Sequence, residues 1–264
     1  MKTITVTHVL ASLEKDIRFD GRKFDEFRKI EVQYGISKKS AEGSARVKIG
    51  DTEVVAGVKM EIGKPFPDNP DEGTIMANVE LLPLSSPDFE TGPPDIKSIE
   101  LARAVIDRGI RESKTLDFKK LCIKKGEKVW MIYIDAYSIN DAGNLADAMG
   151  IAALAALQDA KFPKYDEKSE RIVYDEKTKK KLDLSQLPIP VTVIKIKGKY
   201  LLDPSLEEEK AKEARLTITT VDNGDIVAFQ KGGNGTLTEE DILKMVELST
   251  KKGKEIRKLL KNEK

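Results

Sequence analysis

Three arginines stand close together in the stretch KSIELARAVIDRGIRESKTLDF, which runs from Lys97 to Phe118. They are Arg103, Arg108 and Arg111, and the apolar residues between them recur at helical spacing. A guanidinium group is planar, always charged, and presents paired N–H donors that match the oxygens of a phosphate. The chemistry that this stretch suggests is therefore the binding of an anion such as a phosphate.

The same helix also allows a purely structural explanation of its charges. Acidic residues lie three or four positions from each arginine, and such pairs stabilise a helix by about 0.2–0.5 kcal/mol each. An ideal helix, turning ~100° per residue, places Arg108 and Arg111 together and Arg103 at the opposite border of the apolar face. The expected pairs are Glu100–Arg103, Asp107–Arg111 and Arg108–Glu112, and the expected inward face consists of Ile99, Ala102, Ile106, Gly109 and Ile110.

Other kinds of catalytic or metal site have too few residues in this chain. It contains one cysteine, Cys122, and one histidine, His8. A disulfide within the chain is therefore impossible, and a zinc site would need carboxylate ligands in addition. Catalysis by a Ser-His-Asp or Cys-His set would have to involve His8, near the N-terminus. The sequence predicts no metal site and fits a reducing compartment.

The bulk composition is that of a globular protein without a dominant charge. The 264 residues suffice for one large domain or two modest ones. Charged residues make up 34% of the chain but the net charge is only +1, so any nucleic-acid site must be a local patch. The lysine runs KKLCIKKGEK and KTKKK are typical of solvated surface, although they could add weak attraction for phosphate. The chain shows neither a membrane-spanning run nor a secretory start, so we expect a cytoplasmic protein.

The arginine stretch is embedded in a succession of strands and helices. Turn signals at Gly50-Asp51, Lys197-Gly198 and Asn223-Gly224 each separate two strand-like runs and predict hairpins. The alanine-rich segment 144–160 predicts a helix that packs closely on a sheet, and 237–262 predicts a long final helix. This order favours an α+β fold of two similar units, joined by a charged connector near residues 165–185 that contains a small hairpin.

Six segments, in order along the chain, resemble the RNase PH family. Each is weak alone, but the ordered set is specific and covers nearly the whole sequence. The likeness is narrower still to the non-catalytic RNase PH-like subunit of the archaeal exosome. It implies an RNase PH-like fold with two βαβ-type halves, an N-terminal domain at 1–185 that includes a leading helix and the connector, and a C-terminal domain at 186–264. The segments are RFDGRKFDEFRKI (18–30), IELARAVIDRGIRES (99–113), VWMIYIDAYSINDAGNLADAMGIAALAAL (129–157), LPIPVTV (187–193), LLDPSLEEE (201–209) and QKGGNGTLTEEDI (230–242).

The resemblance also implies an assembly and a role. Chains of this type alternate with a catalytic sister subunit in a six-membered ring that carries RNA-binding cap subunits and threads single-stranded RNA. The sister degrades RNA from its 3′ end with inorganic phosphate, and we expect the complex to use magnesium while this chain binds no cofactor. Arg103, Arg108 and Arg111 would contact RNA at the sister's active site. The apolar runs VWMIYIDAY and IPVTVIKI are the strand edges expected to face a partner.

Two positions argue that the chain is not catalytic by itself. Active members resemble one another in a loop of the form Asp-Gly-Gly/Ser-Thr/Ser-Arg, and Leu145 stands where that arginine would be. They also carry an Asp two residues before a proline, and the matching residue here is Gln186, which cannot ionise. Two alternatives stay open: a phosphorolytic 3′-to-5′ exoribonuclease active in its own right, with Asp183 and Asp203 as its acids, or a purely structural spacer. Asp203 is otherwise explained as a turn residue before Pro204.

Overall fold

The structure, a computed structural model, describes residues 2–166 and 169–262. Its helical elements are α1 (Lys2–Glu14), α2 (Ile96–Glu100), the π-helix η1 (Leu101–Asp107), α3 (Arg108–Glu112), the 3₁₀-helix η2 (Phe118–Leu121), α4 (Leu145–Asp159), α5 (Leu206–Ala211) and α6 (Glu239–Asn262). Its strands are β1 (Ile30–Tyr34), β2 (Gly43–Ile49), β3 (Thr52–Gly63), β4 (Thr74–Glu80), β5 (Cys122–Lys124), β6 (Lys128–Asn140), β7 (Lys161–Asp166), β8 (Arg171–Lys181), β9 (Ile189–Ile196), β10 (Lys199–Leu202), β11 (Ala214–Thr220) and β12 (Ile226–Gly232).

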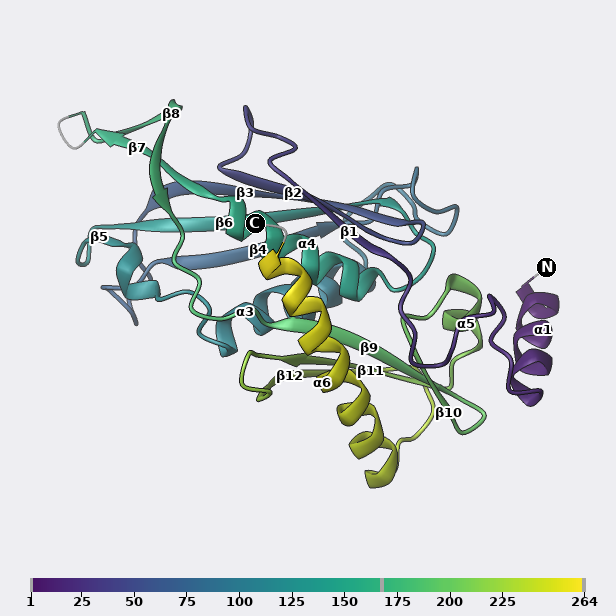
Figure 1. Cartoon of the computed structure of the whole chain (residues 1–264). Coiled ribbons are helices and arrows are strands. Elements are labelled where there is room, and N and C mark those ends of the chain that lie inside the picture. Colours follow the sequence, from purple (N-terminus) through teal and green to yellow (C-terminus); the bar gives the residue numbers. More distant parts are fainter. Residues whose placement is uncertain (1, 167–168, 263–264) are drawn as a thin grey trace.

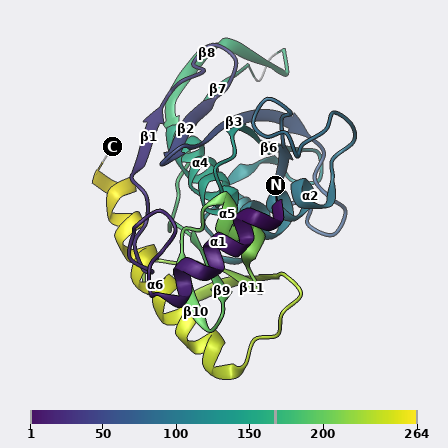
Figure 2. The same cartoon turned by 90° about the vertical axis from the view of Figure 1, so that its right-hand side faces the viewer.

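These elements form four layers (Figures 1 and 2). The first sheet has the strand order β1-β2-β3-β6-β4, with β5 also on β6, and the second has the order β10-β9-β11-β12. The helix α4 and the segment α2-η1-α3 pack between the two sheets, while α6 covers the other face of the second sheet. The strands β7 and β8 form a separate hairpin that projects from one end of the molecule. The predicted α+β fold and its hairpins at Gly50-Asp51, Lys197-Gly198 and Asn223-Gly224 are confirmed.

Among the described strands, directly paired parallel neighbours occur in the first half alone. β4 and β6 run parallel, and the segment α2-η1-α3 lies in the connection between them, as a βαβ crossover requires. In the second sheet every described pair is antiparallel. β10 and β11 flank β9 and therefore run parallel to each other, and α5 lies in the connection between them, so the second half also contains a crossover, with a strand inserted between its two strands.

The two apolar strand runs that we expected at sheet edges lie inside the sheets. β6 is flanked by β3 and β4, and β9 is flanked by β10 and β11. β9 is buried on both faces and β6 mainly on one, and a sequence cannot separate such inner strands from an apolar edge strand. Within the described chain, the edges of the two sheets are β1 and β4 on one and β10 and β12 on the other.

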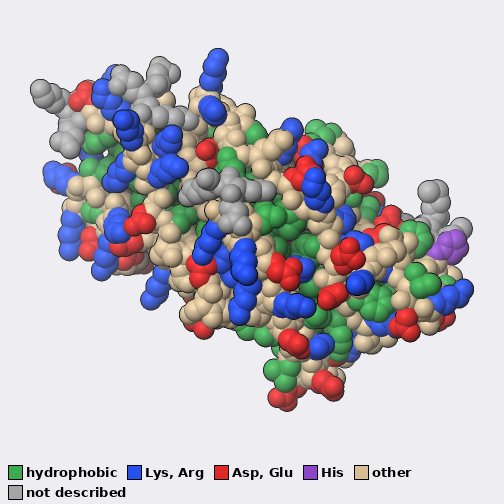
Figure 3. Space-filling model, viewed as in Figure 1, with side chains coloured by type: hydrophobic (Ala, Val, Ile, Leu, Met, Phe, Trp, Pro, Cys, Tyr) green, Lys and Arg blue, Asp and Glu red, His purple; other side chains and the backbone are tan. Residues whose placement is uncertain are grey.

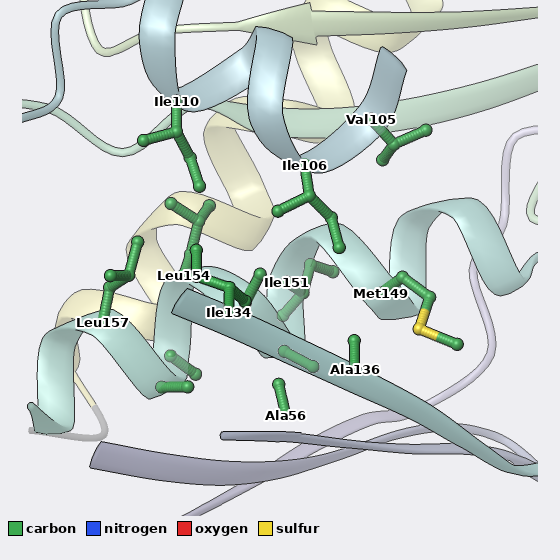
Figure 4. Packing of buried hydrophobic residues seen from close by; sticks show 14 of the residues in the cluster. Ala56, Val105, Ile106, Ile110, Ile134, Ala136, Met149, Ile151, Leu154 and Leu157 are labelled. Carbon is green, nitrogen blue, oxygen red and sulfur yellow. The ribbon is translucent and has the colours of Figure 1, made fainter. Parts of the chain in front are cut away.

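One hydrophobic core joins the two halves, and α4 lies at its centre (Figure 4). The small residues of α4 let it approach closely: a Cβ placed on Gly150 would lie 2.3 Å from Cγ of Pro190, at the start of β9. On its other side Ile151 and Leu154 meet side chains of the first sheet such as Ile134. No helix within residues 2–166 or 169–262 combines the length and the apolar character needed to cross a membrane.

The leading helix α1 belongs with the second half rather than with the first, where the sequence grouped it. Val9 and Leu13 form a small separate cluster with side chains from β9 and β10, and α1 also packs on α5. Next to this cluster Arg18 is fully buried and forms a two-pronged ion pair with Glu208, with both N–O distances 2.7 Å. The helix α1 thus precedes the first half in the sequence but packs on the second half. A domain boundary placed at one position of the sequence therefore does not describe the packing.

Candidate nucleic-acid interface

The arginines lie on one continuous helical segment whose middle turn is wider than an α-helix. Asp95 caps its start by accepting a hydrogen bond from the backbone N–H of Ser98 at 2.7 Å. Further on, the backbone N–H of Arg108 donates to the carbonyl of Arg103, five residues back, as in a π-helix. Residues five apart therefore lie one above the other in this turn, so Arg103 and Arg108 share one side of the segment.

This geometry corrects the predicted arrangement of the arginine helix. One extra residue in a turn rotates the residues before it by about 100° relative to those after it. Arg103 thereby joins Arg108 instead of lying apart from it, and Ile99 is 42% exposed although we expected it to face inward. The rest of the predicted inward face is buried: Ala102, Ile106, Gly109 and Ile110.

The three arginines differ in what holds them. Arg111 is anchored: its Nη2 atom lies 2.7 Å from Oδ1 of Asp107 and 2.9 Å from the carbonyl of Ile75, and the guanidinium stands 5.5 Å from the ring centre of Phe118. Arg103 and Arg108 are exposed, and neither forms an ion pair or a side-chain hydrogen bond with any described residue. Of the three predicted helical pairs, only Asp107–Arg111 therefore forms within the described chain.

Glu100, the expected partner of Arg103, pairs with Arg215 of β11 instead. The second sheet thus removes a carboxylate that helical spacing had assigned to the segment itself. Arg103 and Arg108 remain as two aligned cations with donors available to an external anion.

The N-terminus of α4 is the place where the family's phosphate cradle would be expected, and here it is closed. Leu145 is the first residue of α4 and is only 2% exposed, so its side chain packs into the core. The backbone N–H of Asn144 donates to Oε1 of Glu209 at 2.8 Å, and the N–H of Gly143 donates to Oδ1 of Asp141 at 3.0 Å. These amides, which could have bound an anion, are occupied by the chain's own carboxylates.

Backbone from the second half presses on the same turn. Gly143 has a φ of 93°, and a Cβ at this position would lie 2.5 Å from the carbonyl oxygen of Pro204. The segment that begins at Pro204 therefore packs directly against Gly143, and no side chain fits at this position of the turn.

A hollow of about 340 Å³ lies beside this closed turn, and its charges are paired with one another. Lys97 lies 3.5 Å from Asp141, and Lys212 donates to the carbonyl of Glu209 at 2.8 Å. Burial lowers the pKa of Lys212, and the nearby charge of Arg215 lowers it further. Because cations and acids alternate here, this hollow offers an anion much less than Arg103 and Arg108 do.

Gln186 does not belong to this site, so one of our two arguments for lost catalysis was misplaced. Its Nε2 donates to the carbonyl of Ser113 at 2.6 Å, at the end of the arginine segment. Lys97, at the start of that segment, touches Asp141. Thr192 of β9, which lies six residues beyond Gln186, reaches the first turn of α4 instead, where its backbone N–H donates to Asp147. Gln186 is explained locally, since an amide can donate to a helix-end carbonyl and an ionised carboxylate cannot.

Glu209 is an acidic residue at the N-terminus of α4 that the sequence analysis did not predict. It reaches the N-terminus of α4 from α5, which begins with a capping box between Ser205 and Glu208. The run of three glutamates after Pro204-Ser205 signals this capped turn. Its contact with Asn144, far away in the sequence, leaves no local signal.

Asp183 and Asp203, the acids of the alternative enzyme, do not come together in an open site. Asp183 has a side chain 74% exposed that pairs with Lys120, whereas the side chain of Asp203 is fully buried. Asp203 accepts hydrogen bonds from Arg22, Arg28 and Asn144. Burial alone would raise the pKa of the Asp203 carboxyl, but hydrogen bonds and the charge of Arg28 hold it below its usual value. Asp203 is therefore the hub of a buried network, which is more than the turn residue we expected.

Comparison with known proteins was consistent with this geometry. The model of the 3′ exoribonuclease family, RNase PH, matches residues 26–163 with its domain 1 and 186–252 with its domain 2. The chain belongs to the RNase PH family. It is 48% identical to the exosome complex component Rrp42 of Thermococcus kodakarensis over 99% of this chain and 96% of that protein. The corresponding Archaeoglobus fulgidus protein is 47% identical, over 96% and 95%.

The solved structures extend the match to the fold of this RNase PH chain. A chain of the Archaeoglobus fulgidus exosome, in a structure described as having RNA bound to the active site, superposes with a TM-score of 0.90 at 46% identity and covers 97% of this chain and 98% of that one. The predicted family and RNase PH-like fold are thereby confirmed. Residues 164–185, which hold most of the β7–β8 hairpin, lie outside both family models.

Within the described residues of this RNase PH chain, no group of three or more His, Cys, Asp or Glu side chains is arranged to hold a metal ion. The acids named above are each bound to a cation or to a backbone amide. A divalent cation would have to displace those bonds. Arg103 and Arg108, by contrast, keep donors that are not used by any described residue.

Asp147 makes the stability of the chain depend on pH. Its buried carboxylate accepts hydrogen bonds from the backbone and hydroxyl of Thr192 and from Asn144, yet burial raises its pKa to about 7. In the unfolded chain the pKa is about 3.9, so the folded state binds more protons between about pH 4 and 7. The free energy of unfolding should therefore fall as the pH rises through this range.

Asp147→Asn should remove most of this fall, because the amide does not titrate. Urea unfolding of both proteins at about pH 5 and about pH 8 measures it. The loss of stability between the two pH values should be smaller in the variant by on the order of 1–3 kcal/mol. Equal losses in the two proteins would mean that Asp147 stays ionised in the fold.

Proposed function

We propose that this chain is a non-catalytic ring subunit of an archaeal exosome, a phosphate-dependent complex that degrades RNA from the 3′ end. It alternates with a catalytic RNase PH-like sister subunit and contributes Arg103, Arg108 and Arg111 to RNA held at the sister's active site. The observation that carries the proposal is the pair of exposed, aligned arginines, Arg103 and Arg108, on a chain whose own α4 N-terminus is closed. The names of the relatives support the assembly.

In this proposal the three arginines have two different roles. Arg103 and Arg108 bind backbone phosphate directly, since their donors are free of partners within the described chain and their side chains are exposed. Arg111, anchored by Asp107 and Ile75, fixes the end of the segment and presents its remaining donors beside Phe118. An arginine on a folded helix loses less entropy on binding than one on a mobile loop.

The chain lacks what phosphorolysis asks of an active subunit. That reaction needs an open cradle for inorganic phosphate and a cation beside it. Leu145 supplies no charge, and Glu209 occupies the amide that the phosphate would use. In the complex, inorganic phosphate and magnesium act at the sister subunit, and this chain holds no cofactor of its own.

The partners follow from the same assignment. We propose that this chain forms a heterodimer with the catalytic sister and that three such heterodimers close a ring. The ring binds single-stranded RNA and RNA-binding cap subunits, and it acts in the cytoplasm. Exposed apolar side chains on the edge strand β12, Ile226 and Phe229, offer part of the surface for a protein partner. We therefore assign the surface for a protein partner to β12 and no longer to the inner strands β6 and β9.

The purified chain, supplied with single-stranded RNA, inorganic phosphate and magnesium, should release no nucleoside diphosphate above background. The same preparation mixed with the sister subunit should form a ring and release nucleoside diphosphates. Chromatographic analysis of the products measures both arms, with light scattering to confirm the ring. Sustained phosphate-dependent release by the chain alone would show that it is an enzyme in its own right.

A further inference from the structure

The β7–β8 hairpin carries a group of lysines that repel one another. Lys161 and Lys181 are directly opposite in the antiparallel register, and Lys179 lies two residues before Lys181, where the register shifts. All three are exposed, and none forms an ion pair with a residue of 2–166 or 169–262. Like charges directly opposite in a sheet destabilise it. Their presence points to an anionic partner that compensates the repulsion.

These lysines stand on a fixed platform. The ring of Phe162 packs edge-on against Trp130, with 5.4 Å between the ring centres, and the hydroxyl of Thr178 donates to the carbonyl of Phe162 at 2.7 Å. Lys180, between Lys179 and Lys181, lies over the Phe162 ring at 4.8 Å. Lys179 and Lys181 are thereby directed away from the ring stack, toward solvent.

The hairpin is continuous with the arginine segment. Its last strand leads into Leu184, which bridges to Leu116, and Ser185 donates to the carbonyl of Lys114 at 2.8 Å. Lys181 is three residues from Leu184, a distance of about 10 Å along an extended chain. Figure 3 shows Lys and Arg side chains gathered on the side of the molecule where Figure 1 places β5, β7 and β8. Exposed lysines thus stand at both ends of this connection, Lys114 beside α3 and Lys181 on the hairpin, with the Lys120–Asp183 pair between them.

We infer that Lys161, Lys179 and Lys181 form a second binding surface for the phosphate backbone of single-stranded RNA, which engages the strand outside the part held by Arg103 and Arg108. This inference rests on the proposed function. Lysine suits the task because its ammonium is a flexible point charge that follows a backbone without reading its sequence. Tyr174, on the same hairpin, has an exposed ring, and Nζ of Lys59 in β3 lies 4.4 Å from the centre of that ring. The ring offers a face on which a base stacks.

The test uses the assembled ring with the triple variant Lys161→Ala, Lys179→Ala, Lys181→Ala. Its affinity for an RNA of about thirty nucleotides should fall about tenfold at 0.1 M salt, and the slope of log K against log salt should flatten by up to about 2. An RNA of about six nucleotides, which fills only the active site, should bind as before. The control removes the same charge from the exposed side of α6 with Lys251→Ala, Lys254→Ala and Lys258→Ala.

The possible outcomes test the hairpin surface and the proposed function separately. An unchanged salt slope for the long RNA, or equal losses for the long and the short RNA, would overturn the hairpin surface. Failure of the triple variant to form the ring in light scattering would also overturn it, because the lysines would then serve a protein interface. If the ring with intact lysines binds RNA no more weakly after Arg103 and Arg108 are replaced, the proposed function fails instead, independently of the hairpin.

Discussion

Alanine at both Arg103 and Arg108 is expected to lower the affinity of the assembled ring for RNA by about one to two orders of magnitude. A charge-assisted hydrogen bond contributes roughly 1.5–3 kcal/mol, and two exposed contacts realise only part of that sum. Both side chains point away from the core, so the ring should assemble as before. The loss should be the same for different RNA sequences, and the salt dependence of binding should flatten, because phosphate carries no sequence information.

Two control variants isolate the aligned pair. Arg111→Ala removes a guanidinium that Asp107 and Ile75 already hold, so it should lower the affinity less than the double variant does. Lys254→Ala with Lys258→Ala removes two exposed charges at helical spacing on α6, on the far side of the second sheet. Titration of labelled RNA into each ring at several salt concentrations gives all the values. If the double variant behaves like the α6 control, the arginine segment is only a charged surface and the chain is a structural spacer.

Replacing Glu208 with glutamine is expected to cost on the order of 3–5 kcal/mol of unfolding free energy. The carboxylate of Glu208 receives both Nε and Nη2 of Arg18 at 2.7 Å, and neither side chain is exposed. The glutamine leaves a buried guanidinium without its counter-charge and turns an amide N–H₂ toward it. The same carboxylate accepts the backbone N–H of Ser205 at the start of α5, so the cap weakens as well.

Denaturant unfolding of the two proteins, followed by circular dichroism, measures this loss. Glu247→Gln is the matched control, because Glu247 pairs with Lys244 on the surface of α6. An exposed pair of this kind contributes little, so the control should stay within about 0.5 kcal/mol of the parent protein. A Glu208→Gln variant that is equally stable would mean that the buried pair contributes no net stability.

The elements with strong local signals were predictable from the sequence. The final helix has its capping box, in which Thr238 and Asp241 exchange hydrogen bonds at 2.7 and 3.2 Å. The hairpins form where a glycine permits the turn, as at Gly50, whose φ is 56°. These features depend on a few neighbouring residues, so a sequence pattern contains them.

The π-turn could not be predicted from the sequence, because it breaks the helical periodicity on which the prediction relied. Helical periodicity placed Ile99 in the core and Arg103 apart from Arg108. The segment instead gains one residue in its middle turn, which buries Leu101 and Val105 and exposes Ile99. A single-sequence pattern does not contain the packing between two sheets that makes this wider turn favourable.

The candidate site was predicted in part, for a similar reason. The arginines and Leu145 lie in segments long enough for their place to be clear, and Leu145 is indeed at the N-terminus of α4. Gln186 was assigned from a short match before a proline, and its contact with Ser113 shows a different environment. Glu209 meets Asn144 across 65 positions of sequence, a contact that only the folded chain reveals.

The buried pair of Arg18 and Glu208 also sets an order of events during synthesis. The two residues are 190 positions apart, and α1 packs on strands made equally late. A ribosome adding ~5–20 residues per second needs about 10–40 s to bridge that interval. Throughout that interval α1 and Arg18 have no partner to fold against, whereas the first sheet and its crossover are complete once β6 has been made. The segment of α1 and Arg18, although made well before its partners, is therefore among the last to reach its place, and a chain stalled before α5 would keep it exposed to proteases and chaperones.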